Sequence, residues 1–322
     1  MSSINKIAIL DSSTLSEKYF DWSALKELGD CSFYERTTPS QVLERAKDAE
    51  AIITNKVLLF KDTLSLLPNL KYIGILATGY NNVDIQYCKE RGIRVCNIPA
   101  YSTDSVAQQV FAHILNLANK IALHSESVKN LEWTSSLDFA YKLSPLEELK
   151  GKTLAILGYG AIAKKVAIIA KAFDMNIIAY SRSAKVGSSD ELVSFVSLDD
   201  IFSKADILSL NCALNEDSQN IISKTSLAKM KRNVWIINTA RGGLINEADL
   251  AEFLEESEAY ASVDVLSTEP PRADNPLLGA KKCYITPHNA WMTTQAQERL
   301  IAIAIDNLKK FKEGVAQNGI YG

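Results

Sequence analysis

The 322-residue sequence has few cysteines and few histidines. Its cysteines are odd in number, widely scattered and free of any CxxC spacing, which argues against a disulfide framework or a structural zinc site. We therefore expect no metal site and a reducing compartment, with the cysteines acting as small buried hydrophobic residues. They stand at Cys31, Cys88, Cys96, Cys212 and Cys283.

The sequence also lacks an excess of charge of one sign and any long apolar run. The 35 Lys and Arg residues are interspersed with 38 Asp and Glu residues, so nucleic acid and anionic membrane are poor candidates as partners. No apolar run approaches the length that spans a membrane, and the first residues, MSSINKIAIL, do not resemble a secretion signal. These features predict a cytoplasmic protein with no membrane association.

Short β-branched runs alternate with amphipathic stretches along most of the chain, which is typical of βαβ units and predicts an α/β fold with parallel sheets. The last six runs are the number that a dinucleotide-binding sheet needs. The predicted strands lie at 6–10, 51–55, 71–76, 93–98, 153–157, 175–180, 205–210, 234–238, 259–265 and 283–286.

Four amphipathic stretches predict helices. The stretches 22–28 and 39–47 lie between early strands. A long one at 103–130 predicts a helix that either bridges two lobes or forms a subunit contact. The last, 294–314, ends at Gly314, a plausible stop signal.

The strand at 153–157 leads directly into the sequence GYGAIA and a helical pattern. Gly158 would permit a tight turn, Gly160 would let the backbone approach a pyrophosphate, and Ala163 is small enough for close packing of helix on strand. The helix N-terminus, with Ala161 and Ile162, would face the anion. A tight turn without a ligand is the alternative, but the complete strand, helix and strand context favours nucleotide binding.

After the next predicted strand, an acidic residue would usually bind the ribose 2′-hydroxyl. Here Ser181 lies 23 residues after Gly158 and is followed by Arg182, with Lys185 nearby. The missing acid and the two cations suit the extra phosphate of NADP better than the ribose of NAD. The alternative is an exposed loop whose arginine points into solvent.

Three ionisable side chains follow later predicted strands, namely Arg241 in NTARGG, Glu269 in VDVLSTEPP and His288 in ITPHNAW. The carboxyl ends of parallel strands line the ligand crevice of an open α/β sheet, so these groups can converge. The Arg could bind the carboxylate of a 2-oxo acid, the His could protonate its carbonyl oxygen, and the Glu could orient the His.

Taken singly, each of these residues has a structural interpretation. A lone histidine near a strand end is more often structural, the arginine could lie on the surface of a glycine turn, and the glutamate could start the turn at Pro270 and Pro271. Together, and downstream of a phosphate loop, the three favour catalysis. The other histidines, His113 and His124, are expected to be structural, because they lie within a helical pattern with no acid or glycine turn nearby in the sequence.

In their order and spacing, GYGAIA, NTARGG, VDVLSTEPP and ITPHNAW resemble the D-isomer-specific 2-hydroxyacid dehydrogenases over nearly the whole chain. The segments 77–84 and 97–108 look most like glycerate dehydrogenases, also called hydroxypyruvate reductases. The resemblance implies two Rossmann-like domains with parallel sheets. A dinucleotide-binding domain, 100–291, would be inserted in a discontinuous, flavodoxin-like substrate domain, 1–99 plus 292–322.

The resemblance also implies the roles of individual residues. Arg241, Glu269 and His288 would be catalytic, and Asp264 would hold the nicotinamide carboxamide. The other predicted contacts lie in two groups. The cofactor would meet Gly158, Gly160, Ala161, Ile162, Ser181, Arg182, Ala240 and Asp264, and the substrate carboxylate would meet Arg241 and the backbone of Thr78, Gly79 and Tyr80.

Departures from the family pattern bear on specificity. Ser181 stands where an acid is frequent, and Tyr80 where a smaller residue is common, so cofactor choice and substrate shape could both differ. Ala213 replaces a frequent proline. None of these positions belongs to the predicted acid and base set.

The sequence thus predicts an enzyme that uses NADP or NAD, more readily NADP, to reduce a small 2-oxo acid to the D-2-hydroxy acid. Hydroxypyruvate is the leading substrate, glyoxylate another, and a homodimer is expected from the resemblance. A nucleotide-sensing binding protein on the same fold, like some corepressors, is the main alternative. A methyltransferase would leave the Arg, Glu and His set unexplained, and formate oxidation has less use for Glu269 beside His288.

Overall fold

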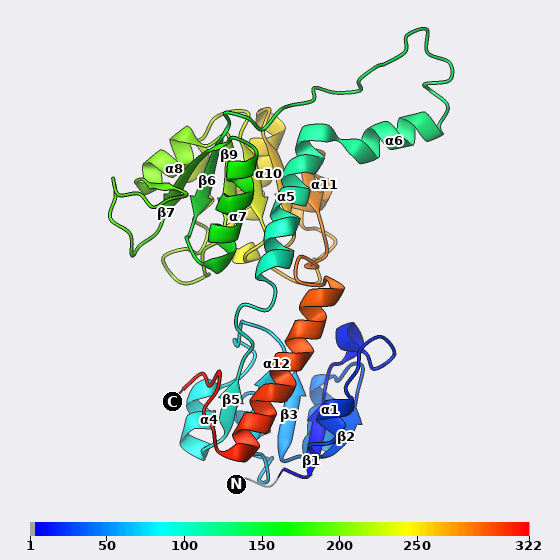
Figure 1. Ribbon diagram of the computed structural model, residues 1–322, viewed down its shortest axis with the longest axis vertical. Helices are drawn as coiled ribbons and strands as arrows, with labels where there is room; N and C mark the ends of the chain where they lie inside the picture. Colours follow the sequence, from blue (N-terminus) through cyan, green and yellow to red (C-terminus); the bar gives the residue numbers. More distant parts are fainter. Residues whose placement is uncertain (1–3, 322) are drawn as a thin grey trace. The chain divides into compact units, whose positions relative to one another are not determined.

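The computed structural model describes residues 4–321, which form two compact units. Unit 1 contains the chain up to Ser102 and again from Met292, and unit 2 contains Thr103–Trp291. Each unit has its own parallel sheet covered by helices, so the predicted α/β class is confirmed (Figure 1).

Unit 1 contains a five-stranded sheet in the order β2-β1-β3-β4-β5, in which every neighbouring pair is parallel. This is the flavodoxin-like order. Every residue of β3 and β4 is buried, as expected for central strands covered on both faces. The strands are β1 (Lys6–Ile9), β2 (Asp30–Phe33), β3 (Ala51–Thr54), β4 (Tyr72–Ile75) and β5 (Arg94–Cys96).

Helices pack on both faces of this sheet. One face forms a core with residues of α2, α3 and α4, including Ala46 and Cys88 against Ile73. On the other face α12 packs on β4, where the rings of Tyr72 and Phe311 lie 5.2 Å apart. The helices are η1 (Ser13–Leu15), α1 (Ser23–Lys26), η2 (Pro39–Gln41), α2 (Val42–Ala46), α3 (Lys61–Leu64), α4 (Ile85–Arg91) and α12 (Thr294–Glu313).

The end of α12 confirms the predicted stop. Gly314 caps the helix in the left-handed conformation, with φ of 78°, a geometry that glycine adopts without steric cost. The buried residues of this helix, among them Leu300, Ala304 and Leu308, recur every four residues. This spacing produces the single apolar face that the sequence pattern indicated.

Unit 2 contains a seven-stranded parallel sheet in the order β12-β11-β10-β9-β6-β7-β8. Six of its strands were predicted, and β8 was not. The strands are β6 (Thr153–Leu157), β7 (Asn176–Tyr180), β8 (Ser194–Phe195), β9 (Ile207–Leu210), β10 (Trp235–Asn238), β11 (Tyr260–Val263) and β12 (Cys283–Ile285).

The sheet of unit 2 lies between two helical layers. One core joins α5 and α7 to one face, and the other joins α8, α9 and α10 to the opposite face. The helices are α5 (Thr103–Asn119), α6 (Ile121–Lys129), α7 (Ala161–Ala172), α8 (Leu198–Lys204), α9 (Lys224–Leu227), η3 (Gly242–Leu244), α10 (Glu247–Glu256) and α11 (Pro276–Gly279).

The prediction of one helix over 103–130 was wrong. Lys120 has a left-handed backbone, with φ of 47°, and divides the stretch into α5 and α6. Its ammonium donates to the Tyr260 hydroxyl over 3.2 Å and lies 4.5 Å from the centre of that ring. The break between α5 and α6 thus lies at a residue with a tertiary contact, and the amphipathic sequence pattern gives no sign of it.

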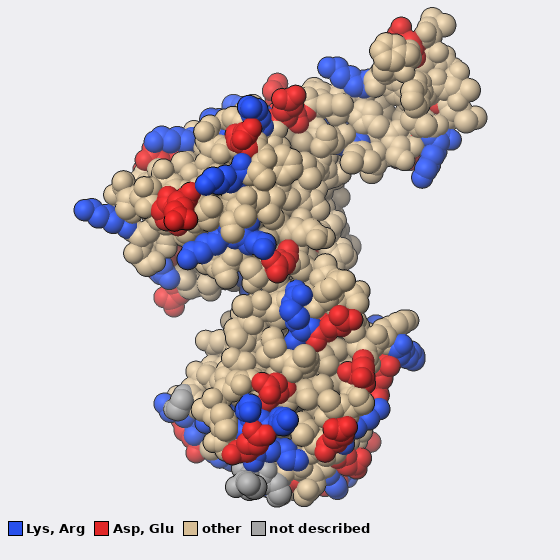
Figure 2. Space-filling model, in the orientation of Figure 1, with Lys and Arg blue, Asp and Glu red and all other residues tan. Residues whose placement is uncertain are grey.

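Helix α6 and residues 130–149 project from the body of unit 2 (Figure 1). We call 121–149 the arm. Leu137 and Phe139 are almost fully exposed, at 103% and 94%, and the face of the arm in Figure 2 carries few charged side chains. In this respect the arm differs from the rest of the surface in that view, where charges of both signs are interspersed.

Two expectations from composition can be compared with the structure. Cys88 and Cys96 are buried, but the other three cysteines are only partly buried. Two of these, Cys212 and Cys283, pack against the margin of a core in unit 2. Within residues 4–321, no helix combines the length and apolar character needed to cross a membrane.

Candidate active site

The loop between β6 and α7 has the glycines that its geometry requires. Gly158 has φ of 91°, and a Cβ at this position would lie 2.6 Å from the backbone nitrogen of Cys212. Any other residue would therefore clash with backbone. Ala163 is fully buried against the sheet, which brings α7 close to β6.

The start of α7 has the features of an anion site. Gly160 is the N-cap, no side chain caps the helix, and no atom lies within 4 Å of the position that a Cβ of Gly160 would occupy. The first-turn amides, including those of Ala161 and Ile162, have no partner in an α-helix and carry the positive end of its dipole. The loop therefore fits a dinucleotide pyrophosphate.

Beyond β7, Ser181 and Arg182 occupy the predicted position for ribose recognition. The Ser181 hydroxyl lies 3.0 Å from that of Ser183. Arg182 does not point freely into solvent, because its Nη1 lies 3.0 Å from Oδ2 of Asp217. Both members of this ion pair are largely exposed.

The turn after β10 presents Arg241. The buried Asn238 accepts a hydrogen bond from the Ala240 amide at 3.0 Å and donates to the Arg241 carbonyl at 2.9 Å, which fixes the turn. A Cβ on Gly242 would lie 1.9 Å from the carbonyl carbon of Leu266. Glycine thus lets this turn pack directly on the segment that carries Glu269, while the Arg241 side chain stays exposed.

Asp264, directly after β11, is 1% exposed. Its carboxylate accepts from the Thr286 hydroxyl at 2.5 Å, the Asn289 amide at 3.0 Å and the Ala290 amide at 2.9 Å. Its observed role is thus to hold residues 286–290, which we call the histidine loop. A contact of Asp264 with the nicotinamide carboxamide stays a prediction.

The histidine loop follows β12 and carries His288. Its φ is 52°, and its amide donates to the Asp264 carbonyl at 2.8 Å. The ring Nδ1 lies 2.6 Å from Oε2 of Glu269, whose Oε1 accepts from the Leu266 amide at 3.1 Å. A glutamate on Nδ1 fixes the tautomer and leaves Nε2 as the atom that can exchange a proton with a ligand.

The residues whose backbone amides are predicted to contact the substrate carboxylate lie in unit 1, just after β4. The Thr78 hydroxyl donates to the Ile98 carbonyl at 2.9 Å, and the Thr78 carbonyl accepts from Asn97 at 2.7 Å. Tyr80 is 43% exposed. The hydrogen bonds of Thr78 thus tie this loop to the segment that follows β5.

The sequence analysis did not predict the contacts of three residues at the site. Asp217 contacts Arg182, Thr286 contacts Asp264, and the buried His113 lies 3.4 Å from the Thr286 hydroxyl. A signal for the last was present, because Ser105, Gln109 and His113 are polar residues spaced by four in this helix. Polar residues at this spacing share one face.

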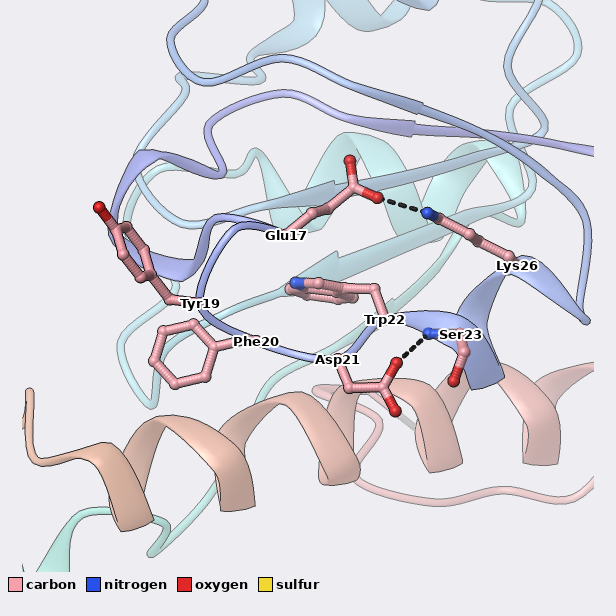
Figure 3. A pocket seen from close by; sticks show the side chains of 7 residues that line it. All are labelled: Glu17, Tyr19, Phe20, Asp21, Trp22, Ser23 and Lys26. Carbon is pink, nitrogen blue, oxygen red and sulfur yellow. Dashed lines mark hydrogen bonds and ion pairs between the residues drawn. The ribbon is translucent and has the colours of Figure 1, made fainter.

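A cavity of about 360 Å³ on unit 1 contains none of the predicted residues (Figure 3). Its polar groups are satisfied locally, since Glu17 pairs with Lys26 at 2.5 Å and Asp21 accepts from the Ser23 amide at 2.8 Å. The indole of Trp22 donates to the Leu15 carbonyl. This cavity therefore has no converging groups without partners and does not compete with the site in unit 2.

The parallel sheet, the glycine loop and the polar groups at its carboxyl edge define a dinucleotide-dependent oxidoreductase. Comparisons with known proteins lead to the same class of enzyme. Residues 111–290 match the model of the D-isomer specific 2-hydroxyacid dehydrogenase NAD-binding domain. The chain is also 40% identical over 317 residues to a hydroxypyruvate reductase of Blautia hydrogenotrophica, covering 97% of this chain and 98% of that protein.

Two solved structures show the same fold. An acyclic imino acid reductase in complex with NADPH and D-Arg has a TM-score of 0.85 at 27% identity, covering 98% of this chain and 99% of that one. A D-lactate dehydrogenase of Aquifex aeolicus, complexed with NAD and lactic acid, has a TM-score of 0.83 at 28% identity, covering 99% of both chains. The chain belongs to the D-isomer-specific 2-hydroxyacid dehydrogenase family, and it is an NAD(P)-dependent oxidoreductase.

Proposed function

We propose that this enzyme reduces hydroxypyruvate to D-glycerate, and glyoxylate as a second substrate, with NADPH preferred over NADH. The observation that carries the proposal is the 2.6 Å contact between His288 and Glu269. This pair lies at the carboxyl edge of the sheet that also carries the glycine loop. The sequence similarity to hydroxypyruvate reductases supports the choice of substrate.

In this reaction we assign separate roles to substrate binding and to proton transfer. The bound nicotinamide supplies the hydride. Arg241 binds the substrate carboxylate through its forked guanidinium. The backbone amides of Thr78, Gly79 and Tyr80 are the other proposed contacts of the substrate. Nε2 of His288 donates a proton to the oxygen that gains negative charge, while Glu269 orients the ring and stabilises its charged form.

The preference for NADPH rests on the loop after β7. Ser181 has no carboxylate to accept hydrogen bonds from a ribose 2′-hydroxyl, and the Arg182 guanidinium can bind a 2′-phosphate there. Lys185 adds a second cation on the same loop. We place Gly158, Gly160, Ala161, Ile162, Ala240 and Asp264 along the rest of the dinucleotide.

We propose further that the protein is a homodimer and that the arm covers a second copy of the chain. The exposed side chains of Ile121, Leu131, Trp133, Leu137 and Phe139 on the arm support this assignment, since a concentration of exposed apolar groups on one surface is typical of a protein contact.

The test is the initial rate of NADPH and NADH oxidation with hydroxypyruvate, glyoxylate and pyruvate. We expect fast turnover of hydroxypyruvate, and His288→Gln to lower kcat by about 10²-fold or more, because general acid catalysis is lost. Dissociation constants for the nucleotide should change by less than about twofold, since the neutral glutamine side chain introduces no charge near the phosphates.

His124→Gln is the matched control, because His124 lies on the arm and its ring contacts the Lys120 carbonyl and the Leu143 amide. It should retain normal turnover. Near-normal kcat of His288→Gln would contradict the assignment. Tight nucleotide binding without turnover of any 2-oxo acid would favour a nucleotide-sensing protein instead.

A further inference from the structure

Behind the histidine loop lies a second histidine, His113, on α5. It is 4% exposed and lies among the residues that bind the loop. Its Nδ1 lies 2.6 Å from the Ser262 hydroxyl on β11, and its Nε2 lies 3.4 Å from the Thr286 hydroxyl. A buried imidazole with both nitrogens near hydroxyl groups has one fixed orientation.

The hydrogen-bond roles in this cluster follow from the carboxylate. The Thr286 hydroxyl donates to Oδ1 of Asp264 at 2.5 Å, and this hydrogen is the only one that the hydroxyl can donate. The Thr286 oxygen can therefore only accept from His113, which assigns the proton of the ring to Nε2. The side-chain amide of Gln109, whose nitrogen lies 3.5 Å from Nε2, then has to turn its oxygen toward the ring. Nδ1 is then the acceptor and the Ser262 hydroxyl the donor. Burial lowers the pKa of His113, and Asp264 opposes this effect, so the neutral ring that the pattern requires is favoured.

The same helix face holds the loop at a second point. Ser105, eight residues before His113, donates its hydroxyl hydrogen to the Ala290 carbonyl at 2.5 Å. Ala290 also donates its amide to Asp264 at 2.9 Å. The loop that carries His288 is thus attached to α5 at both ends, through Thr286 and through Ala290.

We propose that His113 is a positioning residue for the reaction: through Thr286 and Asp264 it fixes the histidine loop and hence the place of the His288 ring. The proposal rests on the proposed function, in which His288 transfers the proton. A displacement of the reacting group by about 1 Å can cost about 10²-fold in rate. Loss of the His113 contact should therefore appear in kcat and not in nucleotide affinity.

Two conservative variants separate positioning from simple packing. The amide nitrogen of a glutamine in place of His113 can reach the position of Nε2 and keep a donor toward Thr286, whereas asparagine is shorter and reaches only the Ser262 side. Both remove the imidazole and leave a polar group in the same buried space. We expect His113→Gln to keep kcat within about threefold of wild type and His113→Asn to lower it at least about tenfold, with nucleotide KM within about twofold in both.

Thr286→Val provides the double-mutant test, because valine retains the shape and lacks the hydroxyl. If His113 acts through Thr286, adding His113→Asn to Thr286→Val should lower kcat by less than about a further twofold. This comparison also covers the case in which His113→Asn alone folds poorly, since Thr286→Val by itself should then show the loss of kcat, by a larger factor than any rise in nucleotide KM.

An NMR measurement that does not need turnover tests the positioning role of His113 separately from the proposed function. The chain has three histidines, so ¹⁵N-histidine spectra resolve each ring. The His288 ring signals should shift in His113→Asn and stay in place in His113→Gln and in the control His124→Asn. Absence of turnover in the wild type would count against the proposed function only, and the spectra would still decide the positioning role.

The positioning role is overturned if folded His113→Asn matches wild type in kcat and in the His288 signals. It is equally overturned if the Gln and Asn variants lose kcat to the same extent and this loss follows their loss of thermal stability. His113 would then be a packing residue alone.

Discussion

At the residue scale, the proposed preference for NADPH depends on Arg182, which forms an ion pair with Asp217. An exposed ion pair of this kind contributes about 0–1 kcal/mol, so a phosphate can displace the Asp217 carboxylate from the guanidinium. The carboxylate nevertheless competes for Arg182 and repels the phosphate. If Arg182 binds the 2′-phosphate as proposed, Asp217 is expected to weaken selection for NADPH.

We predict that Asp217→Asn raises the ratio of kcat/KM for NADPH to that for NADH by about threefold to fivefold, the equivalent of about 1 kcal/mol. Steady-state rates with both nucleotides measure this ratio. Asp199→Asn is the control, because Asp199 forms an exposed pair with Lys229 on another part of unit 2. An unchanged ratio, or an equal change in both variants, would show that Asp217 does not act on the cofactor.

The residues of the candidate site were predictable to different degrees. The placement of Arg241, Glu269 and His288 after strands could be predicted, because each follows a strand-like run and parallel strands end at one edge. Thr286, His113 and Asp217 could not be placed, because their contacts join β12 to α5 and the loop after β7 to that after β9. Such pairings depend on side-chain direction and packing, which one-dimensional patterns do not contain.

At the element scale, the start of α7 offers a prediction about the phosphate site. Since no protein atom lies within 4 Å of a Cβ built on Gly160, Gly160→Ala should fold normally, but its methyl group would occupy the space next to the pyrophosphate. We expect a melting temperature within about 3 °C of wild type and a nucleotide KM raised about tenfold, or about 1.4 kcal/mol.

Gly279→Ala provides the control, because its Cβ also meets open space and it lies in α11. Both variants should melt like the wild type, and only Gly160→Ala should bind nucleotide weakly. If Gly160→Ala retained full nucleotide affinity, the pyrophosphate would have to lie elsewhere.

The contact between α5 and β11 also makes stability depend on pH. Burial lowers the pKa of His113 from 6.5, so below pH 6.5 the unfolded chain binds a proton that the folded chain does not. The free energy of unfolding then falls as pH falls, by at most about 1.4 kcal/mol per unit. Urea titrations from about pH 7.5 down to about pH 5.5 should show a larger loss for wild type than for His113→Gln. Equal slopes would contradict a buried neutral His113.

Most elements were predictable, and the exceptions have physical reasons. Central strands of both sheets show fully buried, isoleucine-containing runs, because these parallel strands are covered on both faces. The edge strands β2 and β8 were missed, since they are half exposed and lack such runs. The division of α5 from α6 at Lys120 was missed because its contact with Tyr260 lies 140 residues away.

At the scale of the whole molecule, the arm determines the predicted state of association. Leu137 and Phe139 are exposed at 103% and 94%, and Ile121 at 69%. Full burial of one such side chain is worth about 1.5–3 kcal/mol, and a two-fold axis uses each residue twice. Burying Leu137 and Phe139 of both copies would thus contribute several kcal/mol, enough to change the dissociation constant by several orders of magnitude.

We therefore predict that the wild type sediments as a dimer at micromolar concentration and that Leu137→Ser with Phe139→Ser shifts it to monomer, as measured by sedimentation velocity over a dilution series. Leu66→Ser is the control, since Leu66 is 56% exposed on unit 1 and lies outside the arm. Circular dichroism should be unchanged in all variants, because neither arm residue belongs to a core. A wild-type monomer at these concentrations, or a dimer that survives both substitutions, would mean that the arm does not hold a second copy.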